Sequence, residues 1–278
     1  MPQPLYSASP SKLLAWLDCP RRYRMQYLDR PRPPTRPPRA HTSVGVATHN
    51  ALRDFWDLAP FERTPAGVEK LVARGWIDVG FRDPEQSAQW RVRTTEAVTE
   101  YLRGIDRDLQ PLGVERTVSL RTETLAVTGR LDRLDDRDGE LVVVDYKTGR
   151  AALTDDDART SLPLAMYAVA VAGMFGRPCE RVELHRVPTA EVLAFEHTPA
   201  TLQRKIAEAE SIALDLRRAD ADYGELGVDS SFFEPRVSPL CRWCDFRAHC
   251  PAGQLVGPEK SDWAGLETNA GADVEPTS

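Results

Sequence analysis

Three charged side chains interrupt a stretch whose other residues suit two strands joined by a turn. The stretch runs from Leu125 to Arg150 (LAVTGRLDRLDDRDGELVVVDYKTGR), and the three charged residues are Asp132, Asp145 and Lys147. Because side chains alternate between the two faces of a strand, we expect Asp145 and Lys147 on one face, about 7 Å apart. Asp132, on the other strand of the hairpin, reaches the same place if the register is ordinary.

This arrangement points to phosphate chemistry assisted by a metal. Two converging carboxylates repel each other, and a bound divalent cation removes that conflict. Hard carboxylate oxygens suit Mg²⁺ or Mn²⁺, and Lys147 would then lie beside the attacking water. Only five of the 36 basic residues are lysines, which indicates a need here for a compact ammonium with a tunable pKa. The alternative is a structural salt bridge from Lys147 to Asp132 or Asp145.

Four of the five cysteines are placed for one metal centre. The last three form a C-x2-C-x5-C motif: Cys241, Cys244 and Cys250. Such spacing lets neighbouring thiolates bind one ion or cluster. Zinc held by these cysteines and His249 is one interpretation. Adding the remote Cys19 gives four thiolates, which suit an iron–sulfur cluster at least as well. Cys179 has no companion and is predicted to be a small buried apolar residue.

Composition and charge narrow the class of protein. The 278 residues are 41% hydrophobic and 28% charged, as in soluble globular proteins. Without an apolar run near 18 residues or a signal-peptide pattern, we expect a cytoplasmic protein with no membrane contact. The net charge of −6 argues against a generally basic nucleic-acid binder, yet residues 1–40 carry eight basic and two acidic side chains. This positive arm would attract phosphate, and its proline-rich part, residues 30–41, is expected to be an extended, mobile linker.

The predicted hairpin is set among helices. A helix over 9–27 should be interrupted at Pro20. Further helices are predicted over 44–58, 64–80, 86–109, 155–174 and 198–219. Further strands are predicted over 113–120, 181–187 and 192–195. This order predicts an α/β domain with a mixed central sheet, over residues 1–256. A disordered acidic tail is expected over 257–278.

The motifs, in this order, resemble RecB-type nucleases of the PD-(D/E)XK superfamily. The nearest group is the one with an iron–sulfur cluster, which includes CRISPR-associated RecB-like exonucleases and AddB-type helicase–nucleases. The likeness spans roughly residues 9–251 and is carried by S-x-S-x-L…C-P-R-R-Y, a helical histidine, G-R-L-D-R-L-D, V-D-Y-K-T-G and C-x2-C-x5-C. It implies a restriction-endonuclease-like core whose terminal segments are joined by a 4Fe–4S cluster, with Zn²⁺ as the alternative. The implied cluster ligands are Cys19, Cys241, Cys244 and Cys250.

The resemblance also implies an active site. Its expected members are His49, Glu115, Asp132, Asp145, Lys147 and Tyr167. His49, Asp132 and Asp145 would bind the Mg²⁺ or Mn²⁺, although a lone histidine beside an apolar helix stripe is more often a core residue. Tyr167 would belong to a helical Gln-x3-Tyr motif, but Pro163 stands at the Gln position.

We therefore expect a metal-dependent DNA nuclease, acting as an exonuclease on single-stranded ends in repair or recombination. A helicase or repair protein is a candidate partner. The chain itself has no P-loop, G-x4-G-K-[ST]. Two alternatives stay open. One is a catalytically inactive DNA-binding scaffold of the same fold, for which Pro163 argues. The other is a zinc-stapled adaptor that works only through protein contacts.

Overall fold

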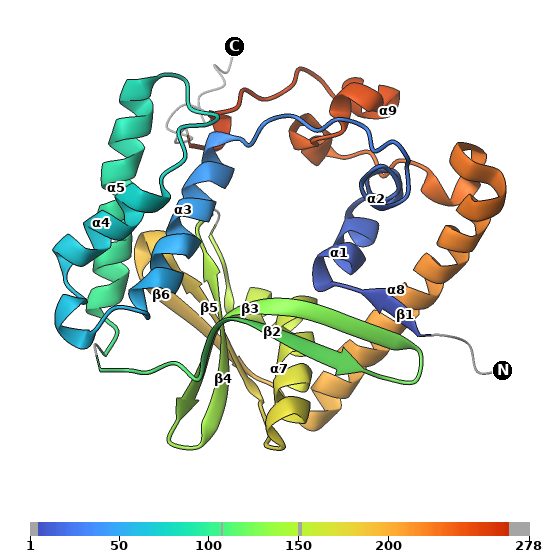
Figure 1. Cartoon of the computed structure of the whole chain (residues 1–278). Coiled ribbons are helices and arrows are strands. Elements are labelled where there is room, and N and C mark those ends of the chain that lie inside the picture. Colours follow the sequence, from blue (N-terminus) through green and yellow to red (C-terminus); the bar gives the residue numbers. More distant parts are fainter. Residues whose placement is uncertain (1–4, 107, 150–151, 267–278) are drawn as a thin grey trace, which may run out of the picture.

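A six-stranded mixed sheet forms the centre of the protein (Figure 1). The computed structural model describes residues 5–106, 108–149 and 152–266. The strands are β1 (Tyr6–Ala8), β2 (Gly113–Arg121), β3 (Leu125–Arg137), β4 (Glu140–Lys147), β5 (Arg181–Arg186) and β6 (Glu191–Glu196). The β1–β3 and β4–β5 pairs are parallel, and the other pairs are antiparallel. The predicted α/β fold with a mixed central sheet is confirmed.

The strand β3 organises the sheet because three strands pair with it. β2 follows one edge of β3 along most of its length. On the other edge, β1 pairs with residues 125–127 and β4 with residues 133–137. Within the described chain, residues 128–132 of that edge have no strand partner. Asp132 therefore lies where β4 separates from β3.

The turn of the β3–β4 hairpin fixes this register. Asp138 and Gly139 form it, with φ values of 54° and 94°. Positive φ at both central residues is the geometry of a two-residue turn that suits the twist of the flanking strands. The turn pairs Arg137 with Glu140 and, four residues further along β3, leaves Arg133 paired with Val144. Local sequence thus places the two halves of the predicted site.

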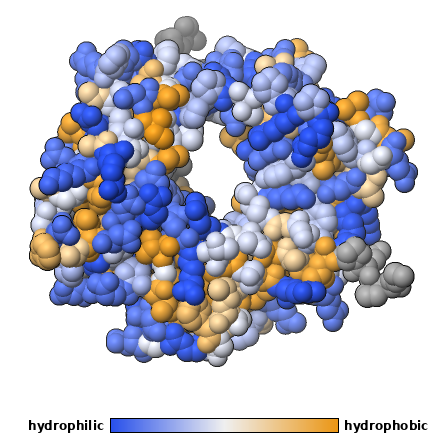
Figure 2. All heavy atoms as spheres, in the orientation of Figure 1, coloured by the Kyte–Doolittle hydropathy of each residue, from blue (hydrophilic) through white to orange (hydrophobic). Residues whose placement is uncertain are grey.

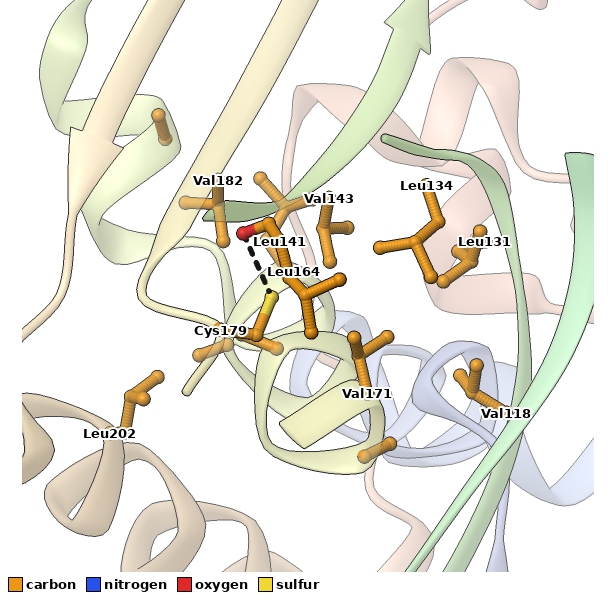
Figure 3. Close-up of a cluster of buried hydrophobic side chains, with 14 of the residues drawn as sticks. Val118, Leu131, Leu134, Leu141, Val143, Leu164, Val171, Cys179, Val182 and Leu202 are labelled. Atoms are coloured by element: carbon orange, nitrogen blue, oxygen red, sulfur yellow. Dashed lines mark hydrogen bonds between the residues drawn. The ribbon is translucent and has the colours of Figure 1, made fainter. Parts of the chain in front are cut away.

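Helices cover both faces of the sheet. The helices α3 (Ala40–Phe55), α4 (Pro65–Gly75) and α5 (Pro84–Arg103) pack on one face, where they meet Val142 and Val144 of β4. The helix α7 (Leu162–Phe175) packs on the other face, where it meets Leu141 and Val143 (Figure 3). This alternation along β4 buries both faces of the strand, as expected for a central strand.

The N-terminal helices form a third packing layer with β1 and a long helix. These elements are α1 (Pro10–Asp18), α2 (Pro20–Tyr27) and α8 (Pro199–Leu226). The predicted interruption at Pro20 is confirmed, and Cys19 lies between the two helices. The single helix predicted over 155–174 is wrong: the chain forms α6 (Asp155–Thr160) and α7 separately, and Ser161 caps α7 by accepting a hydrogen bond from the N–H of Leu164 at 3.4 Å.

The C-terminal segment departs from the prediction of a disordered tail that begins at Gly257. After the short helix α9 (Pro251–Gln254), the chain packs against the start of α3. The N–H of Ala40 donates to the Asp262 carbonyl at 3.0 Å, and Leu266 is 5% exposed against Ala40 and Val44. The prediction is therefore wrong for residues 257–266, and residues 267–278 lie outside the described chain.

This C-terminal segment holds the proline-rich segment, residues 28–39, which we call the strap. Residues 30–39 form neither helix nor strand, as predicted for 30–41, but Ala40 and His41 already belong to α3. Its Arg36 forms ion pairs with Glu259 and Asp262, and Arg39 donates to the Lys260 carbonyl at 3.0 Å. Two of the basic side chains predicted to attract phosphate are therefore bound to the C-terminal segment.

The strap completes a ring of elements around an opening. Figure 2 shows this opening passing through the molecule, and Figure 1 shows α3 on one side, α1 and α2 on the opposite side, β2 and β3 below, and the strap with the C-terminal segment above. Among the described residues, no helix is both long and apolar enough to span a membrane.

Candidate active site

Three of the predicted residues bring ligand atoms to one place. His49 comes from α3, Glu115 from β2 and Asp132 from β3, and one ligand atom from each lies within 4.8 Å of the others. His49 Nδ1 is 3.4 Å from Asp132 Oδ1. The two carboxylates suit Mg²⁺ or Mn²⁺, and the imidazole is a softer donor that suits a divalent transition metal. Glu115, predicted only as a neighbour of the site, thus stands beside two of the predicted metal ligands.

An irregularity in the β2–β3 ladder accounts for this convergence. In the register of the two strands, Glu115 lies across from Asp132, but the ladder is interrupted there and Glu115 has a φ of 49°. Left-handed backbone is unfavourable for a non-glycine residue by ~1–2 kcal/mol. The face alternation of β3 also breaks here, because Leu131 and Leu134 both pack on the α7 side of the sheet. The strain is concentrated where the two carboxylates meet.

The hydrogen bonding of Asp132 follows from the separation of β3 and β4. Beyond the Arg133–Val144 pair, the N–H of Tyr146 has no β3 carbonyl to bind. It donates instead to Asp132 Oδ2 at 2.7 Å. This bond fixes the Asp132 carboxylate beside the strand that carries Asp145.

Asp145 and Lys147 point the same way from β4, as predicted. Lys147 Nζ lies 2.6 Å from Asp145 Oδ2, so the ion pair of the structural alternative is present. Burial raises the pKa of Asp145, and the charge of Asp132 raises it further, although Lys147 and His49 lower it; the net shift is upward. A carboxyl whose pKa stays raised beside an ammonium needs more positive charge to ionise fully, as a divalent cation would supply.

The same negative charge changes the pKa of His49. Burial lowers the pKa of His49, but the hydrogen bond and charge of Asp132 and the charges of Asp145 and Glu115 outweigh it, so the pKa is raised above 6.5. The imidazole ring meets the edge of the Tyr146 ring, with centroids 6.0 Å apart. Glu115, Asp132 and Asp145 outnumber the one nearby ammonium of the described chain, that of Lys147. The site therefore has the negative charge that a bound metal cation requires, and its residues fit a metal.

Tyr167 faces the same carboxylates from α7. Burial raises the pKa of Tyr167 to about 12, together with the charges of Asp145 and Asp132. A Cβ on Gly129 would lie 2.6 Å from Tyr167 Cε1, so only glycine at this position of β3 leaves room for the ring. Pro163 occupies the first turn of α7, where a proline leaves no hydrogen bond unmade.

The four cysteines Cys19, Cys241, Cys244 and Cys250 line one cavity of about 200 Å³, whereas Cys179 is 1% exposed in the sheet core. Cys19 Sγ accepts a hydrogen bond from the N–H of Arg236 at 3.4 Å, and Cys241 Sγ accepts one from the N–H of Ser238 at 3.5 Å. Burial raises the pKa of Cys244, so this thiol would need a metal to ionise near neutral pH.

The spacing of the sulfur atoms bears on which metal fits. Tetrahedral zinc with Zn–S bonds of ~2.3 Å places its sulfur ligands about 3.8 Å apart. In the described chain, no three cysteine sulfurs lie within 4.8 Å of one another. The four sulfurs therefore do not lie at the spacing of a four-thiolate zinc site.

Comparison with known proteins identifies the family. A family model described as the PD-(D/E)XK nuclease superfamily matches residues 7–251. The chain belongs to this superfamily, which implies a metal-dependent phosphodiesterase. No curated protein matches the sequence.

Two solved structures show weak likeness to the chain. A protein of Eubacterium rectale described as a putative exonuclease is 10% identical, with a TM-score of 0.46 over 77% of this chain and 79% of that chain. The structure of SSO0001 is 15% identical, with a TM-score of 0.36 over 90% of this chain and 88% of that chain. The family assignment rests on the family model.

Proposed function

We propose that the protein is a DNA nuclease of the RecB-like iron–sulfur group that degrades single-stranded DNA from free ends. The observation that carries this proposal is the convergence of His49, Glu115 and Asp132 beside the Asp145–Lys147 pair. Superfamily membership supports phosphodiester cleavage by this constellation.

The residues of the site divide into two roles. His49, Asp132 and Asp145 would hold Mg²⁺ or Mn²⁺, with Glu115 as a further ligand within reach. Such a cation, when bound, supplies charge to offset the phosphate and lowers the pKa of a bound water.

Lys147 places a positive charge beside the reacting phosphate. Its ammonium can orient the attacking water by hydrogen bonding and stabilise negative charge that develops on the phosphate. Its partner Asp145 holds it in position across 2.6 Å. Tyr167, beside the same carboxylates, would contact the substrate or the site.

The opening supports action on single strands with free ends. The elements α3 and β3, which carry His49 and Asp132, both border it (Figure 1), and the strap closes it above. A strand can pass through a closed ring only if it has an end to thread. The arginines of α2 form ion pairs with Glu234, Asp18 and Asp29. We infer that the exposed Arg30 and Arg32 of the strap guide the backbone.

The cysteine cavity supports a 4Fe–4S cluster bound by Cys19, Cys241, Cys244 and Cys250. The cluster would be structural, since it would join the N-terminal helices to a segment more than 200 residues away. Closing so long a loop by weak contacts alone is entropically costly. A role in repair or recombination, with a helicase as partner, would follow from activity on single-stranded ends.

Digestion of labelled DNA tests the function. The substrates are one linear single strand, the same strand closed into a circle, and its duplex, each with Mg²⁺, Mn²⁺ or a chelator. We expect metal-dependent cleavage of the linear single strand and no cleavage of the circle. Cleavage of the circle would contradict the requirement for an end. DNA binding by folded, metal-loaded protein without any cleavage would instead support the inactive scaffold.

A metal assay on the same preparation tests the cluster. Protein purified without oxygen should contain iron and sulfide and show the broad visible absorbance of a cluster. One equivalent of zinc with no iron would contradict the cluster.

A further inference from the structure

A second cavity, of about 250 Å³, lies next to the active site between α3, α5 and the residues that follow β4 and β5. Six of its wall residues matter for what could bind there: Val44, Thr48, Trp90, Arg93, Thr148 and Val187. Neither the superfamily assignment nor the mechanism above uses them.

The cavity is built on the same elements as the catalytic residues. Thr148 directly follows Lys147, and Thr48 directly precedes His49. Consecutive Cα atoms are 3.8 Å apart, so the backbones of Thr148 and Thr48 lie next to those of the catalytic residues. A Cβ on Gly45 would lie 3.2 Å from Thr148 Oγ1, which shows that α3 is in close contact with the end of β4.

The walls present an aromatic face and a positive charge. Trp90 is half-buried and is supported from behind by Ala40, Val44 and Leu266. The exposed Arg93 guanidinium lies over the Trp90 ring, 5.4 Å from its centroid, and within the described chain it has no ion-pair partner.

Two of the hydroxyl groups in the cavity already form hydrogen bonds within the protein and are not free to bind a ligand. The Thr48 hydroxyl donates to the Val44 carbonyl at 2.9 Å, and the Thr94 hydroxyl donates to the Trp90 carbonyl at 2.7 Å. Val44 and Val187 add apolar surface. A flat apolar ligand with an attached anion matches such walls.

We propose that this cavity binds one unpaired base of the DNA, from a nucleotide near the cleaved phosphodiester. The base stacks on Trp90 in place of the Arg93 guanidinium, which moves off the ring to bind the phosphate attached to that nucleotide. Stacking on an aromatic face tolerates every base, so the subsite favours single strands without reading sequence. This proposal rests on the proposed nuclease function.

A scan with single abasic sites tests the subsite. Each oligonucleotide lacks the base at one position, and both kcat/KM with Mg²⁺ and Kd with Ca²⁺ are measured for the wild type and for Trp90→Ala. In the wild type, we expect one position at which loss of the base lowers kcat/KM and raises Kd, each roughly tenfold, as for a lost base–aromatic stack. In Trp90→Ala, the complete strand should be weakened by a similar factor, and the penalty at that position should disappear.

Two control variants separate this effect from damage to the fold. Trp90→Phe keeps an aromatic face and should keep the position-specific penalty. Val92→Ala, on the same helix but 55% exposed and outside the cavity walls, should behave as the wild type. Melting temperatures of all variants monitor folding.

The results distinguish the two proposals. If the wild type cleaves DNA and Trp90→Ala shows the same abasic profile, the subsite is wrong and the nuclease function stands. If the wild type binds DNA without cleaving it, the Kd profile still decides the subsite. If the wild type neither binds nor cleaves DNA, both proposals are wrong.

Discussion

Replacing Gly129 with alanine should displace Tyr167 from the active site. The new Cβ would lie 2.6 Å from Tyr167 Cε1, about 0.8 Å closer than the 3.4 Å at which ordinary contacts begin, and 3.2 Å from Pro10 Cδ. The Tyr167 ring is itself packed against the core on the α7 side of the sheet, so it cannot move without disturbing that core. Overpacking of this kind typically costs about 1–3 kcal/mol. For a domain of this size, that is a fall in Tm of roughly 2–10 °C.

A double-mutant cycle isolates the clash. Tyr167→Ala removes the ring, so Gly129→Ala in that background should cost little. Tyr167→Phe keeps Cε1, so Gly129→Ala should remain costly. The free energies of unfolding from denaturant titration give the coupling, and cleavage of linear single-stranded DNA by the folded variants reports the effect on the site. Equal destabilisation by Gly129→Ala with and without the Tyr167 ring would refute the reasoning.

Four further substitutions test the structure. Lys147→Ala should lower kcat by about 10²-fold or more while leaving Mn²⁺ binding measurable by calorimetry, because it removes a charge that acts on the reacting phosphate; Asp132→Ala should lose the metal as well. Burial lowers the pKa of His185 below 6.5, against the hydrogen bond to Glu183, so the unfolded chain takes up a proton that the folded protein does not. The free energy of unfolding should therefore fall as the pH drops below 6.5, by at most about 1.4 kcal/mol per pH unit from this group, and denaturant titrations of His185→Gln should show a weaker dependence. Cys241→Ala should lower both the iron content and the Tm, since a bound cluster stabilises the fold that binds it.

Each of these expectations has an outcome that contradicts it. Full activity in folded Lys147→Ala would defeat the assigned role of the lysine. The same loss of stability with pH in His185→Gln and the wild type would place the titration elsewhere. Unchanged iron content and Tm in Cys241→Ala would exclude a structural role for that thiol.

The parts of the site that depend on local sequence could be predicted. Alternation along a strand places Asp145 and Lys147 on one face, and the Asp138–Gly139 turn sets the hairpin register. Both rules act over a few residues, so they hold before any tertiary contact forms. The break at Pro20 is local in the same way.

The parts that depend on distant contacts could not be predicted from local sequence, and Glu115 was expected near the site only through the family resemblance. Glu115 joins His49 and Asp132 because the β2–β3 register brings it across from Asp132 and because its backbone is left-handed. Neither condition is encoded in the type of residue. The proposed base subsite is equally hidden, since Trp90 meets the end of β4 only after α5 packs on the sheet.

The composition of the C-terminal segment was misleading for a related reason. Averaged over residues 257–278, the chain is polar and acidic, which is typical of disorder. Leu266 nevertheless packs against Val44, and Glu259 and Asp262 pair with Arg36. The sequence did indicate this contact, because the N-terminal segment is basic and the C-terminal segment is acidic. The composition of each segment taken alone does not reveal that the two could pair.

The closure of the strap by the C-terminal segment imposes an order on biosynthesis. Arg36 leaves the ribosome more than 200 residues before Asp262, its partner in the ring. At ~5–20 residues per second, the interval is roughly 10–45 seconds. During that time the strap already links α2 to α3, but the contacts of Arg36 and Arg39 with residues 259–262 are missing. We expect nascent chains stalled before Glu259 to bring their catalytic residues together on the sheet and α3 beneath a strap that nothing in the C-terminal segment yet holds.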